Sequence, residues 1–188
     1  MAGVRAVVFV VLLACSIGAF ANDPDMLQDV CVADASGQIT NKVLGSKVTG
    51  ANVMDIPGLN TLGVSMARVD FAPYGLNPPH IHPRATEIIY VLEGELYVAF
   101  ITTGNKLISK VVKTGEVFVF PRGLAHYQKN KSKYPTSVIA AFNSQLPGTQ
   151  QFAAALFTSN PPVSNDVLAQ TFNIDEHNVE KIKAGLAA

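Results

Sequence analysis

Three histidines and one glutamate lie in two short stretches, and their residue types are those of a metal site. The first stretch contains His80 and His82 followed by Glu87, and the second contains His126. Three imidazoles and one carboxylate can hold a metal ion while leaving coordination positions open. A site with open positions binds or transforms a small molecule, whereas a closed site only holds a fold together. The pattern therefore predicts an open metal centre.

The spacing of the first stretch indicates a β structure with a break in it. His80 and His82 are two residues apart, so in a strand both side chains point to the same face. Glu87 has the opposite parity and can join them only if the chain turns or bulges in between. Residues 83–86, which begin with a proline, provide that break. We therefore expect all three side chains to enter one barrel.

The second stretch adds amide side chains to the histidine. Pro121 and Gly123 shape a bend that directs His126 inward, and Gln128 and Asn130 share its parity. Both amides are therefore candidates to line the same cavity. Asn130 also begins the glycosylation sequence Asn-Lys-Ser, but a place on the cavity face argues against an attached glycan.

A structural explanation competes with the metal site. A single inward histidine is more often a hydrogen-bonded core residue than a ligand. Two histidines followed by an off-parity glutamate are harder to explain in this way, because burying a carboxylate without a cation costs several kcal/mol. We therefore favour the metal site, and we expect His177, which has no partner in its spacing, to lie at the surface.

Most of the chain after Asn52 consists of short β-rich segments bounded by Gly, Pro or Asn. The clearest segments are 62–71, 87–92, 95–102, 107–112, 116–120 and 137–143. Strands at this spacing predict an antiparallel sandwich or barrel. After Pro162 the pattern changes to two helices, with Ser164 and Asp175 as N-caps and one apolar face each. The fold class is therefore mainly β, a β-barrel with a C-terminal α-helical extension.

Residues 1–21 have the features of a signal peptide. Arg5 gives a positive start, an apolar run follows at 7–13, and Ala19-Phe20-Ala21 is a cleavage signal. The apolar run is too short for a transmembrane helix, and no later stretch approaches membrane-spanning length. We expect a secreted protein that begins near Asn22 and forms a single domain over residues 22–188.

Charge and cysteine content narrow the function classes. Without Arg5 the chain has 13 basic and 14 acidic residues, so it lacks the basic surface that a nucleic-acid partner requires. Cys15 lies in the signal peptide, which leaves Cys31 alone in the mature chain. Its neighbours Val30 and Val32 favour burial of the thiol over reactivity.

The two stretches, in this order and spacing, resemble the cupin motifs, and the surrounding sequence is similar to the germin-like proteins of plants. The similarity runs from about Asp25 to the C-terminus and is clearest at 57–63, 77–87, 120–126 and 159–162. It implies a cupin jelly-roll β-barrel, secretion to the cell-wall space (apoplast) and a homo-oligomer. That oligomer would be a hexamer, a trimer of dimers in which C-terminal helices clasp neighbours. It also implies Mn²⁺ bound by His80, His82, Glu87 and His126.

The sequence also departs from the family pattern. Family members carry two N-terminal cysteines, but here only Cys31 matches, and the second cysteine and much of the loop are absent between Ser36 and Lys47. The oxalate oxidases of the family have an asparagine in the strand before the first stretch, where this chain has Ala67. Their second asparagine is kept as Asn77.

The resemblance implies an extracellular superoxide dismutase or an oxalate oxidase, which converts oxalate and O₂ to CO₂ and H₂O₂. Dismutation requires little beyond the metal and access to it. Oxalate requires polar groups, and the amide missing at Ala67 removes a hydrogen bond worth about 0.5–1.5 kcal/mol, or more to a charged ligand. We therefore rank dismutase first, with Asn77 and Asn130 as the residues that would bind a small oxygen species or a small carboxylate.

Two alternatives stay open at this point. The chain can instead be a non-catalytic storage, receptor or cell-wall protein that keeps the metal as part of the fold, such as a nutrient reservoir. The metal is also open, because imidazole ligands suit Zn, Cu, Ni and Fe as well. Only the family resemblance selects manganese.

Overall fold

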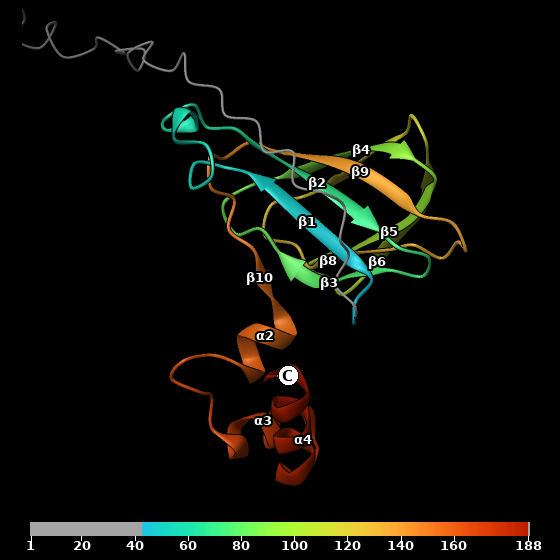
Figure 1. Ribbon diagram of the computed structural model, residues 1–188. Coiled ribbons are helices and arrows are strands. Elements are labelled where there is room, and N and C mark those ends of the chain that lie inside the picture. The colour runs from blue at the N-terminus through green and yellow to red at the C-terminus, as the bar shows by residue number, and fades with distance from the viewer. Residues whose placement is uncertain (1–42, 188) are drawn as a thin grey trace, which may run out of the picture.

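The computed structural model describes residues 43–187, which form two antiparallel β-sheets followed by a group of short helices (Figure 1). In chain order the elements are β1 (Ser46–Ala51), η1 (Pro57–Leu59), β2 (Ser65–Phe71), β3 (Leu76–Ile81), β4 (Glu87–Glu93), β5 (Glu95–Ile101), β6 (Leu107–Lys113), β7 (Val117–Phe120), β8 (His126–Lys129), β9 (Thr136–Phe142), β10 (Gln150–Gln151), α2 (Phe152–Phe157), α3 (Asn165–Phe172) and α4 (Glu176–Ala187). The predicted signal peptide and Cys31 lie outside the described residues.

The two sheets have the strand orders β1-β2-β9-β4-β7 and β10-β3-β8-β5-β6. The chain passes from one sheet to the other at almost every connection after β2, as in a jelly roll. This connectivity brings strands that are distant in sequence next to each other, such as β2 beside β9 and β3 beside β8. The predicted mainly β jelly-roll barrel with a helical C-terminus is therefore confirmed.

The core lies between the sheets and follows from the alternation of side chains along each strand. In β4, Ile89 and Val91 are buried while Ile88 and Tyr90 are exposed. The other sheet contributes side chains from β5 and β6 to the same core. The largest fully buried apolar residues of this core are Phe71, Ile89, Val91, Leu96, Val98, Val112, Phe120 and Val138. Each contributes about 1.5–3 kcal/mol through burial, which makes the barrel a rigid support for the site.

All six predicted strand segments are strands, with boundaries that differ by a few residues. Four strands lie outside these six segments, namely β1, β3, β8 and β10, and the longer two, β1 and β3, have weak local signals. β1 is a strand because Ser46–Ala51 pairs along its whole length with β2. β3 contains Pro78 and Pro79, and its register against β8 shifts between Asn77 and His80. Pairing with a neighbouring strand, rather than local sequence, therefore makes β1 and β3 strands.

The helices begin where their caps were predicted. Ser164 is the N-cap residue of α3, and the Asp175 carboxylate accepts a 2.7 Å hydrogen bond from the Asn178 main-chain N–H at the start of α4. The short helix α2, which the sequence analysis did not include, connects them to β10. Figure 1 shows the three helices together beyond one end of the barrel, joined to it through β10.

The apolar faces of the three helices pack partly against each other. Phe157, Leu168 and Val179, one from each helix, are buried against each other. Several large apolar side chains of α3 and α4 remain exposed, namely Val167, Phe172, Ile182 and Leu186. Among residues 43–187, no helix combines the length and the apolar character needed to cross a membrane.

Candidate metal centre

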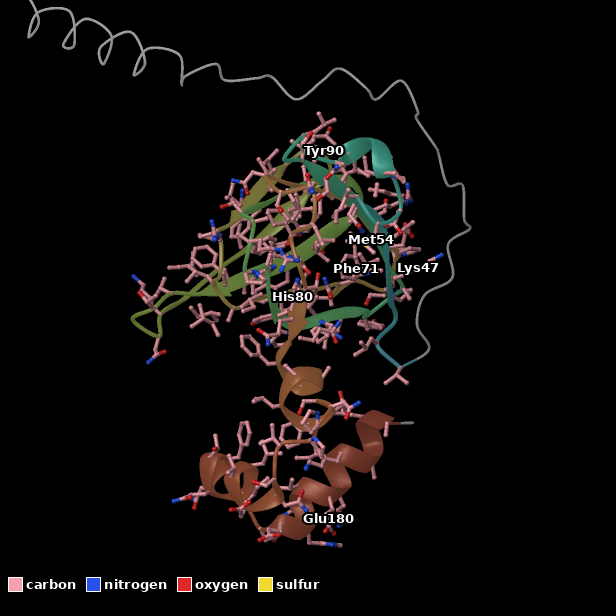
Figure 2. The ribbon with its side chains drawn as sticks, turned by 90° about the vertical axis from the view of Figure 1, so that its left-hand side faces the viewer. Lys47, Met54, Phe71, His80, Tyr90 and Glu180 are labelled. Atoms are coloured by element: carbon pink, nitrogen blue, oxygen red, sulfur yellow. The ribbon has the colours of Figure 1, made fainter. Side chains whose placement is uncertain are left out.

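The four predicted ligands meet inside the barrel. His80 lies at the end of β3, His82 follows that strand directly, and Glu87 and His126 are the first residues of β4 and β8. All four side chains are buried, and one ligand atom from each lies within 4.8 Å of the others. Figure 2 shows His80 within the barrel, near the end from which the chain leads to the helices. The convergence that the spacing predicted is confirmed.

Strand register explains how two distant stretches form one cluster. His80 pairs directly with His126 across β3 and β8, and their ring centroids are 4.2 Å apart. Glu87 comes from the opposite sheet, where it lies between Phe120 and Phe142 on the neighbouring strands. The segment between β3 and β4 carries the chain from one sheet to the other. This crossing is the break that the off-parity glutamate required.

Main-chain carbonyl oxygens hold all three imidazoles in place. The Nδ1 atoms of His80, His82 and His126 lie 2.7, 2.7 and 2.8 Å from the carbonyl oxygens of Pro78, Gly148 and Leu124, respectively. A carbonyl oxygen only accepts, so each Nδ1 carries the proton and donates it. Each Nε2 is then free to present a lone pair to the centre of the cluster, as in bound metal sites.

The contacts with Glu87 show why this donor set fits a cation. Glu87 Oε2 lies 3.0 Å from His82 Nε2 and 3.1 Å from His126 Nε2. Because both Nδ1 atoms carry a ring proton, these contacts place Nε2 lone pairs against a charged oxygen unless something positive lies between them. Either extra protons or a shared metal ion must lie between them. Three nitrogen donors and one carboxylate around one point therefore fit a divalent metal.

The protonation states also suit metal binding. Burial lowers the pKa of His80 to about 4, with help from His126, while the hydrogen bond to Pro78 opposes the shift. This imidazole is therefore neutral near pH 7. Burial alone would raise the pKa of Glu87, but in the metal-free protein the contacts with His126 and His82, each with a proton between Nε2 and the carboxylate, outweigh it and lower that pKa to about 2. Glu87 is therefore ionised.

A cavity of about 300 Å³ reaches the cluster from outside. His80, His82, Glu87 and Asn77 are among the residues that line it. The rest of the wall combines apolar residues, including Val48, Ala67, Val69, Ala140, Phe142 and Pro147, with the polar residues Asn52, Ser65, Thr149 and Gln151. Val48 belongs to β1, whose contribution to the cavity the sequence pattern did not indicate. The cavity admits a small molecule to the ligands.

The side-chain amides of Asn77 and Gln128 form a hydrogen-bonded chain that leads to Glu87. Asn77 Nδ2 donates to Gln128 Oε1 at 2.7 Å, and Gln128 Nε2 donates to Glu87 Oε1 at 3.4 Å. All three side chains are buried. Gln128, which parity placed on the inward face, thus contacts the carboxylate oxygen that faces away from the histidines. The amide pair fixes the orientation of Glu87.

Asn130 is placed differently. It follows the last residue of β8, so the alternation that directs Gln128 inward no longer applies to it. Its amide donates to the carbonyl oxygens of Ala72 and Tyr134 and accepts from the Ser132 N–H. These bonds engage both ends of the amide in a turn, and Asn130 is not among the residues that line the cavity. Because Asn130 is fully buried, a glycan has no access to it in this fold, whereas His177 is exposed as predicted.

The loop that supports His82 was not found from the sequence. Gly148, whose carbonyl oxygen accepts from His82, lies in a segment held by Arg84. The Arg84 guanidinium donates to the carbonyl oxygen of Leu146 at 2.7 Å, and its main-chain N–H donates to Pro147. A supporting main-chain carbonyl leaves no mark in residue type, so only the Pro-Gly turn signal marks this segment.

Comparison with known proteins agrees with this geometry. A cupin family model matches residues 33–180. Germin-like protein subfamily 2 member 4 of Arabidopsis thaliana is 55% identical over 95% of this chain and 94% of its own length. Germin-like protein 1-1 of Oryza sativa subsp. japonica is also 55% identical, over 93% of each chain. A solved structure of oxalate oxidase with the substrate analogue glycolate is 44% identical, with a TM-score of 0.81 over 90% of this chain and 86% of that chain. The chain therefore belongs to the cupin family and, within it, to the germin-like proteins of plants.

Proposed function

We propose that this germin-like protein binds Mn²⁺ through its three histidines and Glu87 and acts as an extracellular superoxide dismutase. The observation that carries the proposal is the buried cluster, in which three imidazoles of fixed orientation and one ionised carboxylate face a common point. A manganese ion bound there supplies two accessible oxidation states. The residues of the chain hold the ion, and the cavity gives access to it.

The choice of manganese rests on the family together with the donor set. Imidazole alone favours copper and zinc over manganese in affinity. A carboxylate and open positions suit an ion of octahedral preference better than a tetrahedral one. The similarity to germin-like proteins and to oxalate oxidase supports the choice of manganese for the cluster of this chain.

The cavity wall supports dismutation over oxalate oxidation. Ala67 is 7% exposed and lines the cavity, so its methyl group stands where the related oxidases would offer an amide. Asn77 lines the cavity too, but its amide already donates to Gln128. A dicarboxylate needs polar partners to offset its lost hydration, whereas a small oxygen species needs few.

Two alternatives have support of their own. Oxalate oxidation is favoured by the 44% identity to oxalate oxidase and by the retained Asn77. A storage, receptor or cell-wall role requires only that the metal stabilises the fold, because a bound ion adds its binding free energy to folding. Both are ranked below dismutation.

A superoxide assay on manganese-loaded protein separates these functions. We expect dismutation that depends on manganese and is lost in His126→Ala, with little oxalate turnover by either protein. Circular dichroism of the variant controls for folding. Fast oxalate turnover by the wild type would instead establish the oxidase. Protein that is loaded with manganese but inert in both assays would establish the storage or binding role.

We further propose that residues 1–21 are removed as a signal peptide, that residues 22–188 form the mature domain, and that the protein is secreted to the apoplast. The sequence of the N-terminus supports this, as set out above. Secreted material with an N-terminus near Asn22 is the expected result of N-terminal sequencing. Retention of residues 1–21, or retention of the protein inside the cell, would contradict it.

We also propose a homo-oligomer, a hexamer built as a trimer of dimers. The support is the apolar surface of α3 and α4, where Val167, Ile182 and Leu186 remain exposed after the helices have packed on each other. Light scattering coupled to size exclusion should give a mass of six chains. A monomeric mass at micromolar concentration would contradict the assembly.

A further inference from the structure

The outer face of the second sheet carries a pair of tyrosines that the metal centre does not use. Tyr97 on β5 and Tyr127 on β8 are diagonal neighbours, because Tyr97 pairs with Lys129 and Tyr127 with Ala99. Their ring centroids are 6.1 Å apart, with an interplanar angle of 45°. Both rings are partly exposed, so reagents in solution can reach them.

The two rings of this pair lie side by side, and the neighbouring Ser109 and Tyr127 side chains lower the pKa of Tyr97. The Lys131 ammonium lies 3.4 Å from the centroid of the Tyr97 ring. This cation therefore covers the face of the Tyr97 ring and not the edge that carries the reactive carbons.

We propose that Tyr97 and Tyr127 form an oxidative modification site, at which a peroxidase and hydrogen peroxide join the two rings as dityrosine. The peroxidase removes one hydrogen atom, an electron with its proton, from each phenol. The two radicals couple through the carbons beside the hydroxyl groups, and the proton on each coupled carbon moves to its oxygen. The protein loses two hydrogen atoms in total, and one peroxide is reduced to two waters. Tyr127 follows the ligand His126 in the chain, but its side chain lies on the opposite face of the sheet.

Geometry favours this pair over tyrosines that are easier to reach. Tyr74, Tyr90 and Tyr134 are more exposed, at 61%, 47% and 64%. All five tyrosines belong to the described residues, and within that range only Tyr97 and Tyr127 are in ring contact with each other. Two radicals held side by side couple within one molecule, which a dilute pair of molecules does far more slowly.

The bond would link β5 to β8 covalently and so close a large ring in the chain that includes β6 and β7. The two tyrosines are 30 residues apart in the chain, and β8 begins with the ligand His126. A covalent link of this kind restricts the unfolded chain, as a disulfide does. Oxidised protein should therefore unfold at a higher urea concentration than untreated protein.

The test treats dilute mature protein with a haem peroxidase and hydrogen peroxide and then digests it with trypsin. Tyr97 and Tyr127 fall in the tryptic peptides 85–106 and 123–129. The expected product is these two peptides joined, lighter by two hydrogen atoms than their sum, with dityrosine fluorescence. Its yield per chain should not change when the protein is diluted further, because both rings belong to one chain.

Conservative variants assign the product to the pair. Tyr97→Phe and Tyr127→Phe should each lose it, while Tyr90→Phe, which alters the other tyrosine in peptide 85–106, should keep it. Urea unfolding of the untreated variants confirms that they fold. Cross-links that form only between chains, or that involve Tyr74 or Tyr134 instead, would overturn the proposal. So would the absence of any product under conditions in which the same peroxidase couples free tyrosine.

Discussion

His80 and His126 face each other directly across β3 and β8, with ring centroids 4.2 Å apart, although 46 positions separate them in the chain. This pairing is what turns two sequence stretches into one cluster, and Glu87 closes it from the opposite sheet. Each ring is held through Nδ1 by a main-chain carbonyl. The arrangement presents its Nε2 atoms before any ion arrives, and such preorganisation favours tight binding.

The cavity wall predicts which substrate the site prefers. Ala67→Asn adds an amide to the residues that line the cavity, among which Asn77 already lies. Because one hydrogen bond to a charged group is worth about 1.5–3 kcal/mol, oxalate turnover should rise by roughly tenfold or more. Superoxide dismutation should stay about unchanged. Steady-state assays of both reactions on manganese-loaded protein measure this, and wild-type protein that already matches the variant on oxalate would refute our ranking.

The loop that orients His82 predicts a second effect. Gly148 has φ +68°, and a Cβ there would lie 2.7 Å from the Arg84 guanidinium. Gly148→Ala should therefore displace the Arg84 guanidinium, break its hydrogen bond to Leu146, loosen the loop that holds His82 and lower metal affinity by about 10–100-fold. Isothermal titration with Mn²⁺ measures this affinity.

Gly63→Ala is the matched control. Gly63 has nearly the same φ, +69°, but a Cβ there meets nothing within 4 Å. Both variants should lose about 1–3 kcal/mol of unfolding free energy from backbone strain, while only Gly148→Ala should lose metal affinity. Equal affinity in the two variants would show that the loop does not position His82.

Acid should destabilise the metal-free protein in two steps. The pKa of His80 is about 4 in the folded state, against an ordinary value of 6.5, so between these pH values only the unfolded chain binds the proton. Stability is therefore lost as the pH falls from 6.5 toward 4. The pKa of Glu87 is lowered from 4.5 to about 2, so its contribution is present above pH 4.5 and is lost below it.

Urea unfolding of metal-free protein across this pH range measures both steps. His80→Gln should remove the upper step, and His177→Gln, at an exposed position, should leave it in place. A wild-type stability that is flat between pH 6.5 and 4 would contradict the buried neutral state of His80.

The sequence predicted the ligands well because metal sites depend on side-chain type and on parity within strands. His80 and His82 met both conditions, and the proline-led break after them explained Glu87. Asn130 shows the limit of the parity argument. β8 ends at Lys129, so the next side chain is directed by a turn, and its amide binds main-chain atoms there.

Features that depend on the main chain or on distant pairing were beyond the sequence. The carbonyl of Gly148 has no side chain to mark it, and it reaches His82 across 66 positions. β1 likewise has a weak local pattern and becomes a strand only because β2 lies beside it. Val48, which β1 contributes to the cavity wall, could be placed only once that pairing was known.

Manganese binding to metal-free protein tests the central claim most directly. Electron paramagnetic resonance follows the signal of free Mn²⁺ as the ion is added to the wild type and to Glu87→Gln, which keeps the size of the side chain and removes its charge. We predict that the wild type takes up one ion per chain and that Glu87→Gln takes up almost none at the same concentration. A wild type that leaves the free signal unchanged, or a variant that binds as well as the wild type, would contradict a manganese centre at this cluster.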